Sequence, residues 1–110
     1  MAEALKRLGA TAVVANTDTL LYQVEAGKMA SVSSIAVVNK GASIRTYRLA
    51  HVDGAGIASV AAEDYFAYDF EIPAFTTFPF TIGVTMGQLD SLMVRANHAE
   101  VSFIAWGAES

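Results

Sequence analysis

Residues 20–52 constrain the fold more than any other part of the chain, because they hold two long β-rich runs on either side of a tight turn. The runs are residues 29–39 and 43–52, and the turn is Asn39-Lys40-Gly41. Gly41 is expected to supply the positive φ that a tight connection often needs. A shorter run at 19–24 and a turn at 25–28 come before them. The segment predicts one strand followed by a β-hairpin.

Alternation of apolar and polar residues predicts further strands on both sides of this segment. In the clearest of them, residues 64–72, one face carries Phe66, Tyr68, Phe70 and Ile72. Shorter strands are expected at residues 11–15, 80–86, 91–96 and 100–106, with a glycine-rich loop at 53–63 that has room for one helical turn. Seven or eight strands at this spacing predict an all-β fold, an antiparallel β-sandwich of the jelly-roll kind.

The first nine residues follow a different pattern. Residues 1–8 mix alanine and leucine with charged residues, which is typical of a short helix, and Gly9 would end it. So short a helix is marginal by itself in water. We therefore expect residues 1–9 to form an N-terminal arm or a helix that docks elsewhere, and residues 10–110 to form a single β-sandwich domain.

The composition favours self-association. Of the 110 residues 54% are hydrophobic and 16% are charged, against a typical charged share of about 25%. Some apolar surface is then expected to be buried between subunits. The net charge of −4 and the lack of a basic stripe argue against nucleic acid as a partner. No apolar run reaches the roughly 20 residues that cross a bilayer, so no membrane partner is expected either.

Reactive side chains are few, and none has a patterned partner. The chain has no cysteine and two histidines, His51 and His98, for which a triad with Ser102 and Asp90 is the catalytic alternative to an ordinary structural role. Asp69 and Glu71 share a predicted strand face, so a calcium site or a glycosidase pair is the alternative to a solvated surface. We expect no enzyme, no catalytic residue, no cofactor and no metal site.

Three aromatic residues are not easily placed in a core. Phe75 and Phe78 lie in the predicted loop 74–79, and Trp106 has the opposite parity to Phe103. Exposed aromatic side chains anchor protein contacts or stack on sugars. Protein contact is the favoured interpretation, and simple packing within a loop is the alternative.

With these strands in place, the chain resembles the small β-sandwich structural proteins of tailed bacteriophages. The resemblance extends over residues 19–107. It rests on segments 22–28, 32–35, 68–73, 80–86 and 101–107, and on Asn39 with Gly41. These segments form a pattern of strands and turns with no catalytic signature. Glu25 is a departure, because such sequences often carry proline before Ala-Gly-Lys.

The resemblance implies a virion structural protein that is made in the host cytoplasm. The first hypothesis is a capsid decoration or cement protein, a homo-oligomer expected to be a trimer, which binds the major capsid protein or another virion protein. The candidate assembly contacts are Leu5, Leu8, Phe75, Phe78 and Trp106. A tail, neck or baseplate component is the alternative within this class. A carbohydrate-binding module with Trp106, Phe75 or Tyr65 as its platform is the alternative outside it.

Overall fold

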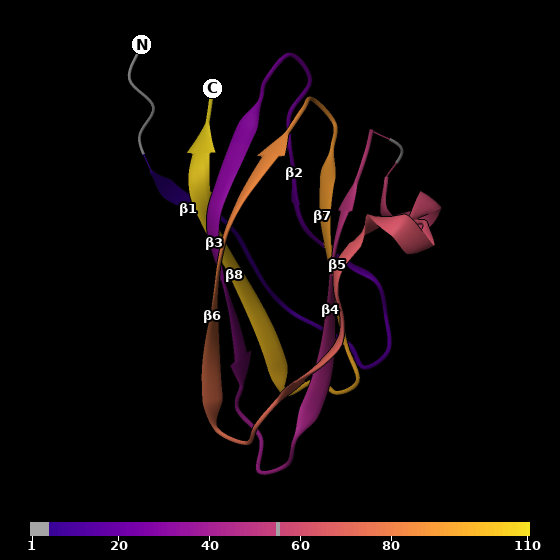
Figure 1. Ribbon diagram of the computed structural model, residues 1–110, viewed down its shortest axis with the longest axis vertical. Helices are drawn as coiled ribbons and strands as arrows, with labels where there is room; N and C mark the ends of the chain where they lie inside the picture. The colour runs from indigo at the N-terminus through magenta and orange to yellow at the C-terminus, as the bar shows by residue number, and fades with distance from the viewer. Residues whose placement is uncertain (1–4, 55) are drawn as a thin grey trace.

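The fold is an antiparallel β-sandwich of eight strands, seen in a computed structural model that describes residues 5–54 and 56–110 (Figure 1). The strands are β1 (Lys6–Ala12), β2 (Thr19–Gln23), β3 (Ala30–Asn39), β4 (Arg45–Val52), β5 (Tyr65–Ile72), β6 (Thr76–Met86), β7 (Ser91–Ala96) and β8 (Val101–Glu109). The helical segments described are the 3₁₀ turns η1 (Ile57–Ser59) and η2 (Ala62–Asp64). Within residues 5–54 and 56–110, no helix has the length and apolar character to cross a membrane.

The eight strands divide equally between two sheets. Sheet A has the order β1-β8-β3-β6, and sheet B has the order β2-β7-β4-β5. Neighbours in each sheet are antiparallel. Two four-stranded sheets interleaved in this order form the jelly-roll arrangement, a fold found in viral capsid proteins, lectins and cupins. The predicted all-β sandwich is confirmed.

The predicted hairpin between residues 29–39 and 43–52 is wrong, because β3 and β4 belong to different sheets. The turn at residues 39–41 carries the chain across the sandwich, so each strand pairs with distant partners. Gly41 also differs from the expectation, since its φ is not positive. It is buried, and a Cβ at this position would overlap the Glu100 carboxylate. A larger residue here would have to displace the Glu100 carboxylate from its 2.9 Å hydrogen bond with Arg45 Nη2.

The predicted N-terminal helix is wrong for Lys6 to Leu8, which form the start of β1. Lys6 lies opposite Gly107 and Arg7 opposite Trp106 on β8. Leu8 is half-buried and packs against the core. Pairing with β8 satisfies the backbone groups and buries Leu8, neither of which an isolated short helix achieves. Residues 1–4 of the predicted arm lie outside the described residues.

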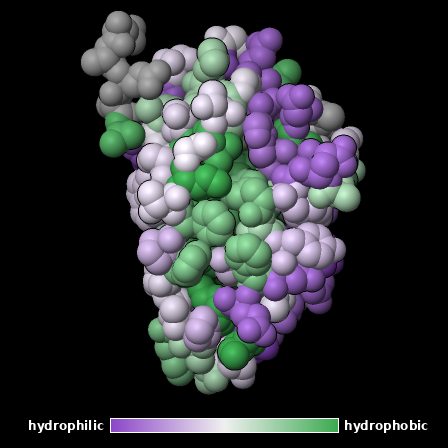
Figure 2. Space-filling view, viewed as in Figure 1, coloured by the Kyte–Doolittle hydropathy of each residue, from purple (hydrophilic) through white to green (hydrophobic). Residues whose placement is uncertain are grey.

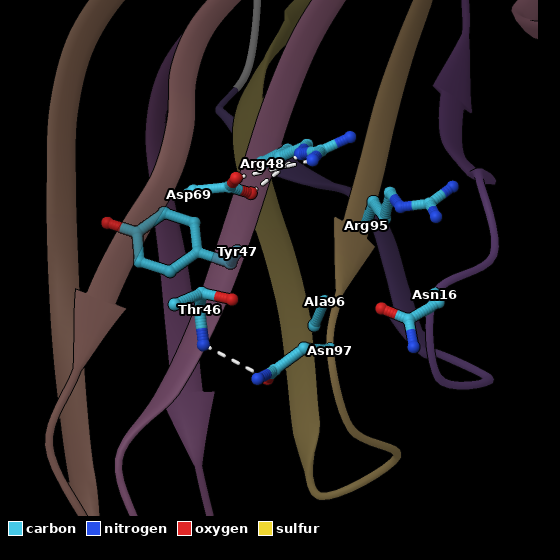
Figure 3. Close-up of a pocket in the computed structure, with 8 residues that line it drawn as sticks. All are labelled: Asn16, Thr46, Tyr47, Arg48, Asp69, Arg95, Ala96 and Asn97. Carbon is cyan, nitrogen blue, oxygen red and sulfur yellow. Dashed lines mark hydrogen bonds and ion pairs between the residues drawn. The ribbon is translucent and has the colours of Figure 1, made fainter.

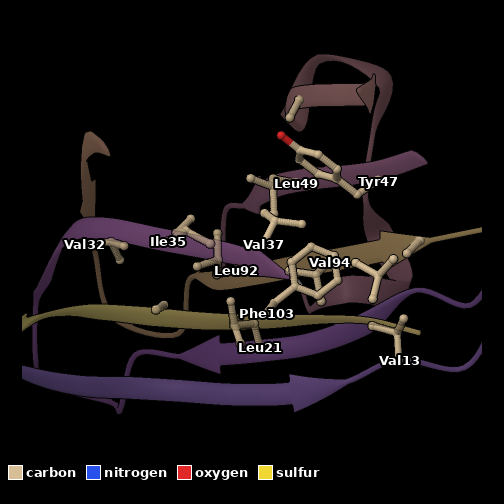
Figure 4. Packing of buried hydrophobic residues seen from close by; sticks show 14 of the residues in the cluster. Val13, Leu21, Val32, Ile35, Val37, Tyr47, Leu49, Leu92, Val94 and Phe103 are labelled. Carbon is tan, nitrogen blue, oxygen red and sulfur yellow. The ribbon is translucent and has the colours of Figure 1, made fainter. Parts of the chain in front are cut away.

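The core fills the space between the two sheets (Figure 4). Its largest fully buried side chains include Tyr47, Phe103, Ile35, Leu49 and Leu92. A second, small cluster lies on the outer side of sheet B, where Ile57, Val60 and Tyr65 pack over Ala50, Val52 and Met93. The loop that contains η1 and η2 thus covers part of the outer face of sheet B.

The tyrosine and lysine of the 22–28 segment have a structural role. The Tyr22 hydroxyl donates to the Glu109 carboxylate, linking β2 to β8 of the other sheet. Lys28 Nζ lies 3.8 Å from the same carboxylate. The hydrogen bond from Tyr22, with the charge of Lys28, holds the pKa of Glu109 below its ordinary value. The backbones of Met29 and Ser110 also exchange two hydrogen bonds of 2.9 Å. This segment therefore fixes the C-terminal strand.

Gly107 provides a test of how closely β8 and β3 approach. A Cβ on residue 107 would overlap the Ser31 carbonyl oxygen, a backbone atom that cannot rotate away, and would lie 3.0 Å from a Leu8 methyl carbon. Gly107→Ala is therefore expected to lower the free energy of unfolding by about 1–3 kcal/mol through overpacking. Urea denaturation measures this change.

Gly83→Ala is the matched control, because a Cβ at residue 83 meets nothing within 4 Å. It is expected to change the free energy of unfolding by less than about 0.5 kcal/mol. Equal stability of the two variants would contradict the described packing of β8 on β3.

Candidate functional site

The histidines do not form the catalytic triad considered from the sequence. His51 Nε2 lies 2.8 Å from Asp90 Oδ2, which also accepts the backbone N–H of Gly87 at 2.9 Å. His98 Nδ1 accepts the N–H of Glu100 at 3.1 Å. Within residues 5–54 and 56–110, no hydrogen bond joins Ser102 to either imidazole. Both histidines therefore stabilise turns.

Asp90 is the titratable residue with the most extensive contacts in this region. Burial opposes its ionisation, but the hydrogen bonds from His51 and from the Gly87 N–H outweigh burial and hold the pKa of Asp90 below its ordinary value. The carboxylate anchors the turn between β6 and β7 by accepting the Gly87 N–H. The Asp90 backbone carbonyl accepts the N–H of Val24 at 3.0 Å, which ties the same turn to the end of β2. Sequence reasoning named Asp90 only as a possible triad member.

Within the acidic pair Asp69 and Glu71, the Asp69 carboxylate is engaged by an arginine. Asp69 has a φ of 52° and accepts a hydrogen bond of 2.7 Å from Arg48 Nε, which holds the pKa of Asp69 below its ordinary value (Figure 3). The Arg48 guanidinium also lies 4.1 Å from the ring centre of Tyr68. The residues described contain no group of three or more acidic or histidine side chains placed to hold a metal ion. The adjacent cavity, about 50 Å³, has room for a few water molecules at most.

The five candidate contact residues do not gather in one place. Leu5 is 76% exposed ahead of β1, whereas Leu8 packs on the core. Phe75 is 75% exposed between β5 and β6 and has a φ of 54°. Phe78 is 44% exposed, but it lies on β6, so the predicted loop at residues 74–79 is wrong from Thr76 onwards. Trp106 is 37% exposed on the outer face of sheet A. Exposure was predicted for the three aromatic residues, and the structure agrees.

The outer face of sheet A is nearly uncharged, and no described segment packs over it. Strand pairing arranges its outward side chains in three rows, each with one residue from every strand of the sheet. The rows are Ala12, Ser102, Val38 and Thr77; Ala10, Ile104, Ala36 and Pro79; and Arg7, Trp106, Ser34 and Thr81. Arg7 is the one charged residue among them. We call this surface the neutral face.

The outer face of sheet B has a different character. Part of it lies under the loop with η1 and η2. The rest carries ion pairs, Arg48 with Asp69 at 2.7 Å and Arg95 with Asp18 at 3.0 Å. A covering loop on one part of the face and charged side chains already paired with each other on the rest leave little surface for a flat partner. The neutral face is therefore the better candidate for contact with another protein.

A second candidate surface is an aromatic seam along the side of the sandwich between the edge strands β5 and β6. Its members are Phe66 and Phe70 of β5 and Phe78 and Phe80 of β6, with ring centres 5.8–6.4 Å apart. Figure 2 shows hydrophobic residues filling a strip between the two sheets on this side. No described segment covers the seam, so Phe70 stays 45% exposed although it pairs with the buried Tyr47.

The alternation predicted for residues 64–72 fails at Tyr68. Asp69 adopts positive φ and adds a bulge between the pairs Leu49–Ala67 and Tyr47–Phe70. The bulge places Tyr68 beside Arg48 on the outer face of sheet B, where the Tyr65 ring meets it edge to face at 5.0 Å. Ala67 and Ile72 are the buried residues of this strand.

One end of the seam widens into an acidic groove of about 660 Å³. It is lined by His51, Asp53, Glu63, Asp64, Tyr65, Phe66 and the β6 residues Ile82, Gly83, Val84 and Thr85. No local signal in the sequence places Glu63 and Asp64 beside this wall of β6, because the wall is brought to them only by the fold. We call this feature the acidic groove.

Neither a scan against protein-family models nor a search of curated proteins found a match to the chain.

The aromatic residues considered as a sugar platform lie apart. Trp106 is on the neutral face, Tyr65 packs on the outer side of sheet B, and Phe75 is in the connection between β5 and β6. Stacking on a saccharide would therefore use one of these rings at a time, and Trp106 has Arg7 and Ser34 beside it.

The role of Asp90 can be tested by pH. Because its pKa is lower in the folded protein, its contribution is present above the unfolded value of about 3.9 and is lost as the pH falls through the folded value. Asp90→Asn is expected to cost about 1–3 kcal/mol of unfolding free energy at pH 7. The difference from wild type should shrink as the pH falls below about 4, as measured by urea denaturation across the range.

Glu71→Gln is the control, because the exposed Glu71 has no side-chain hydrogen bond or ion pair with the described residues. Its free energy of unfolding should vary with pH as that of wild type does. A pH-independent loss in Asp90→Asn would show that shape, and not charge, accounts for the contribution of Asp90.

Proposed function

We propose that the protein is a structural component of a tailed-bacteriophage virion, with capsid decoration or cementing as its role. In this proposal it acts as a homo-oligomer, a trimer, that binds the major capsid protein or another virion protein. The neutral face carries the proposal, because it is an uncovered, nearly uncharged sheet surface. The resemblance of the strand and turn pattern to phage structural proteins is the reason for proposing a virion protein.

The composition of the neutral face suits the centre of a protein contact. Cores of interfaces are poor in charged residues and rich in aromatic ones. Trp106 lies within the face at 37% exposure, beside Ile104 on the same strand. Tryptophan is also frequent among residues that dominate binding energy. The jelly-roll fold adds weaker support, because it occurs in viral capsid proteins and in unrelated classes alike.

The size of the face supports binding as an oligomer. Four strands at about 4.8 Å spacing and three rows along them give a surface of about 20 by 20 Å. The resulting area of about 400 Å² is near half of the roughly 800 Å² that each partner contributes to a standard interface. Several linked copies that bind a repeating lattice together gain strength from multivalency. Oligomerisation would therefore be part of the mechanism of shell stabilisation.

The location on the particle can be tested by immunogold labelling of virions made from the genome that encodes this chain. Label over the head supports the decoration role, and label confined to the tail, neck or baseplate supports the alternative within the class. Particles without label would overturn the proposal. A glycan array tests the other class, since saccharide binding abolished by Trp106→Ala would favour a carbohydrate-binding module.

The neutral face can be tested with Ile104→Lys, which places a charge in the middle row. Burying an unpaired ammonium at a contact is costly, so binding to virion particles is expected to weaken at least about tenfold, equivalent to about 1.4 kcal/mol. Co-sedimentation with particles that lack the protein measures the effect.

Thr46→Lys is the matched control, because it adds the same charge on sheet B, at a position paired with Glu71. It should bind as wild type does. Thermal unfolding of both variants establishes that they are folded. Undiminished binding by Ile104→Lys would exclude the neutral face as the contact.

A further inference from the structure

We propose that two copies of this chain pair through the side that carries the aromatic seam and the acidic groove, with Phe75 of each copy seated in the groove of the other. This inference rests on the self-association within the proposed function and assigns it a surface. The two copies are related by a two-fold axis that passes beside Phe80 and is perpendicular to sheet A. A two-fold contact does not close a trimer, so in the proposed assembly it joins copies from neighbouring trimers.

The side with β5 and β6 has a projecting residue at one end and a hollow at the other. Phe75 is 75% exposed in the connection between β5 and β6, which crosses this side at its lower end in Figure 1. The groove lies along the other half of β6, where residues 82–85 form one of its walls. Residues 75 and 85 are equally far from Phe80 along the chain. A half-turn about an axis beside Phe80 therefore brings each Phe75 to the level of the other copy's groove.

The groove can receive an aromatic ring. Its volume of about 660 Å³ falls in the range of about 300–1,000 Å³ found for pockets that hold small molecules. A Cβ at Gly83 would meet nothing within 4 Å, so the β6 wall is open at this residue. Aromatic rings gain from edge-to-face or offset contact with each other. The apolar part of the lining is made by Tyr65, Phe66, Ile82 and Val84.

Phe75 is held in a defined position. Its φ of 54° is uncommon for a residue with a side chain, and its N–H donates to the Gly41 carbonyl oxygen at 3.1 Å. The Pro73 carbonyl oxygen, two residues earlier, accepts the Asn39 amide at 3.1 Å. A residue already fixed in the free protein loses little conformational freedom on binding. Phe75 is therefore suited to anchor a contact.

The contact is made by side chains and not by added strands. Pro79 has no backbone N–H to donate from β6. The register of β6 against β3 shifts between Thr81 and Val84, and a bulge at Asp69 interrupts β5. Edge strands with proline and bulges resist backbone pairing with another chain. The two edge strands therefore approach through the aromatic rings between them.

The aromatic seam supplies the centre of the contact. Phe70 is 45% exposed and stacks on Phe80 with ring centres 6.4 Å apart, so it lies at the level of the axis and meets its own copy. The half-turn also sets Phe78, which is 44% exposed, at the level of Ile82. With extents of 44 × 29 × 19 Å, this side projects about 1,000 Å², above the roughly 800 Å² per partner of a standard interface.

The charges select this axis over one that runs along the strands. An axis along the strands would set groove against groove and bring the carboxylates of both copies together, which repulsion disfavours. The axis across the strands sets each groove against the end that carries Phe75. Lys40 is exposed at that end and forms no ion pair with residues 5–54 or 56–110. The two ends therefore differ in charge in the sense that favours their contact.

The same axis gives both neutral faces one orientation. Because it is perpendicular to sheet A, the half-turn leaves the two faces pointing the same way, whereas an axis along the strands would point them in opposite directions. Two faces of about 400 Å² side by side give about 800 Å², the area that each partner contributes to a standard interface. A pair can therefore bind one flat surface with both copies at once.

Two variants test the contact from its two sides. Gly83→Trp fills the groove at a position where a Cβ meets nothing within 4 Å, and Phe75→Ser removes the projecting ring. Each is expected to weaken self-association at least about tenfold, equivalent to about 1.4 kcal/mol, as measured by analytical ultracentrifugation of the full chain. Val14→Ser is the matched control, because Val14 is 70% exposed in the connection between β1 and β2. It should associate as wild type does. Thermal unfolding establishes that the variants are folded.

Cross-linking identifies the axis. The chain has no cysteine, so single introduced cysteines give defined links. Thr77 and Gly83 are exposed on β6 and lie equally far from Phe80 on either side. A mixture of Thr77→Cys and Gly83→Cys should form dimers with a short bismaleimide cross-linker. Neither variant alone should do so, since like residues lie about 20 Å apart across the axis.

The outcomes separate the contact from the proposals on which it rests. Dimers formed by each cysteine variant alone, or no dimers in the mixture, would overturn the arrangement. Undiminished association of Gly83→Trp and Phe75→Ser would overturn the contact and leave self-association standing. A wild-type chain that stays monomeric at about 100 μM, far above a micromolar dissociation constant, would overturn the self-association itself. These measurements need no virion, so they are independent of the labelling that tests the location.

Discussion

The arrangement of the sandwich depends on the buried side chain of Asn39. Its amide nitrogen lies 2.8 Å from the Ser43 carbonyl oxygen and 3.1 Å from the carbonyl oxygens of Ile72 and Pro73, while its Oδ1 accepts the Gly41 N–H at 3.0 Å. These contacts join the connection between β3 and β4 to the connection between β5 and β6, and both connections cross from one sheet to the other. Because an unsatisfied buried amide is costly, the two crossings hold each other in place. They also fix β5 and β6 as the two edges that border the aromatic seam.

The strands could be predicted from the sequence because alternation is a local signal, but their pairing could not. The turn at residues 39–41 has the residues of a hairpin, yet the Asn39 amide bonds to carbonyl groups more than thirty residues away, at Ile72 and Pro73. The start of β1 looked helical because propensity ignores the free edge of β8, which offers Lys6 and Arg7 a partner. Tyr68 was misplaced because a positive φ at Asp69, which is not glycine, leaves no trace in the pattern.

The candidate surfaces were only partly predictable for the same reason. Exposure of Trp106 followed from its parity and that of Phe75 from its loop position, whereas Phe78 is exposed although it lies on β6. The neutral face, however, arises from rows of side chains on four strands, and Ala10, Ile104, Ala36 and Pro79 become neighbours only through pairing. The acidic groove likewise needs the β4–β5 connection to face β6. Surfaces of this kind depend on register, which a single sequence specifies only weakly.

The neutral face exists because the charged side chains of the described strands lie mostly elsewhere. Arg48 and Arg95 are paired with Asp69 and Asp18 on the side of sheet B, whereas the three rows on sheet A carry Arg7 as their one charged residue. A face of about 400 Å² is near half of the area that one partner contributes to a standard interface, so a single copy would bind only weakly. Several linked copies on a repeating lattice would gain strength from multivalency, and a sparsely charged chain with few reactive side chains is suited to such assembly.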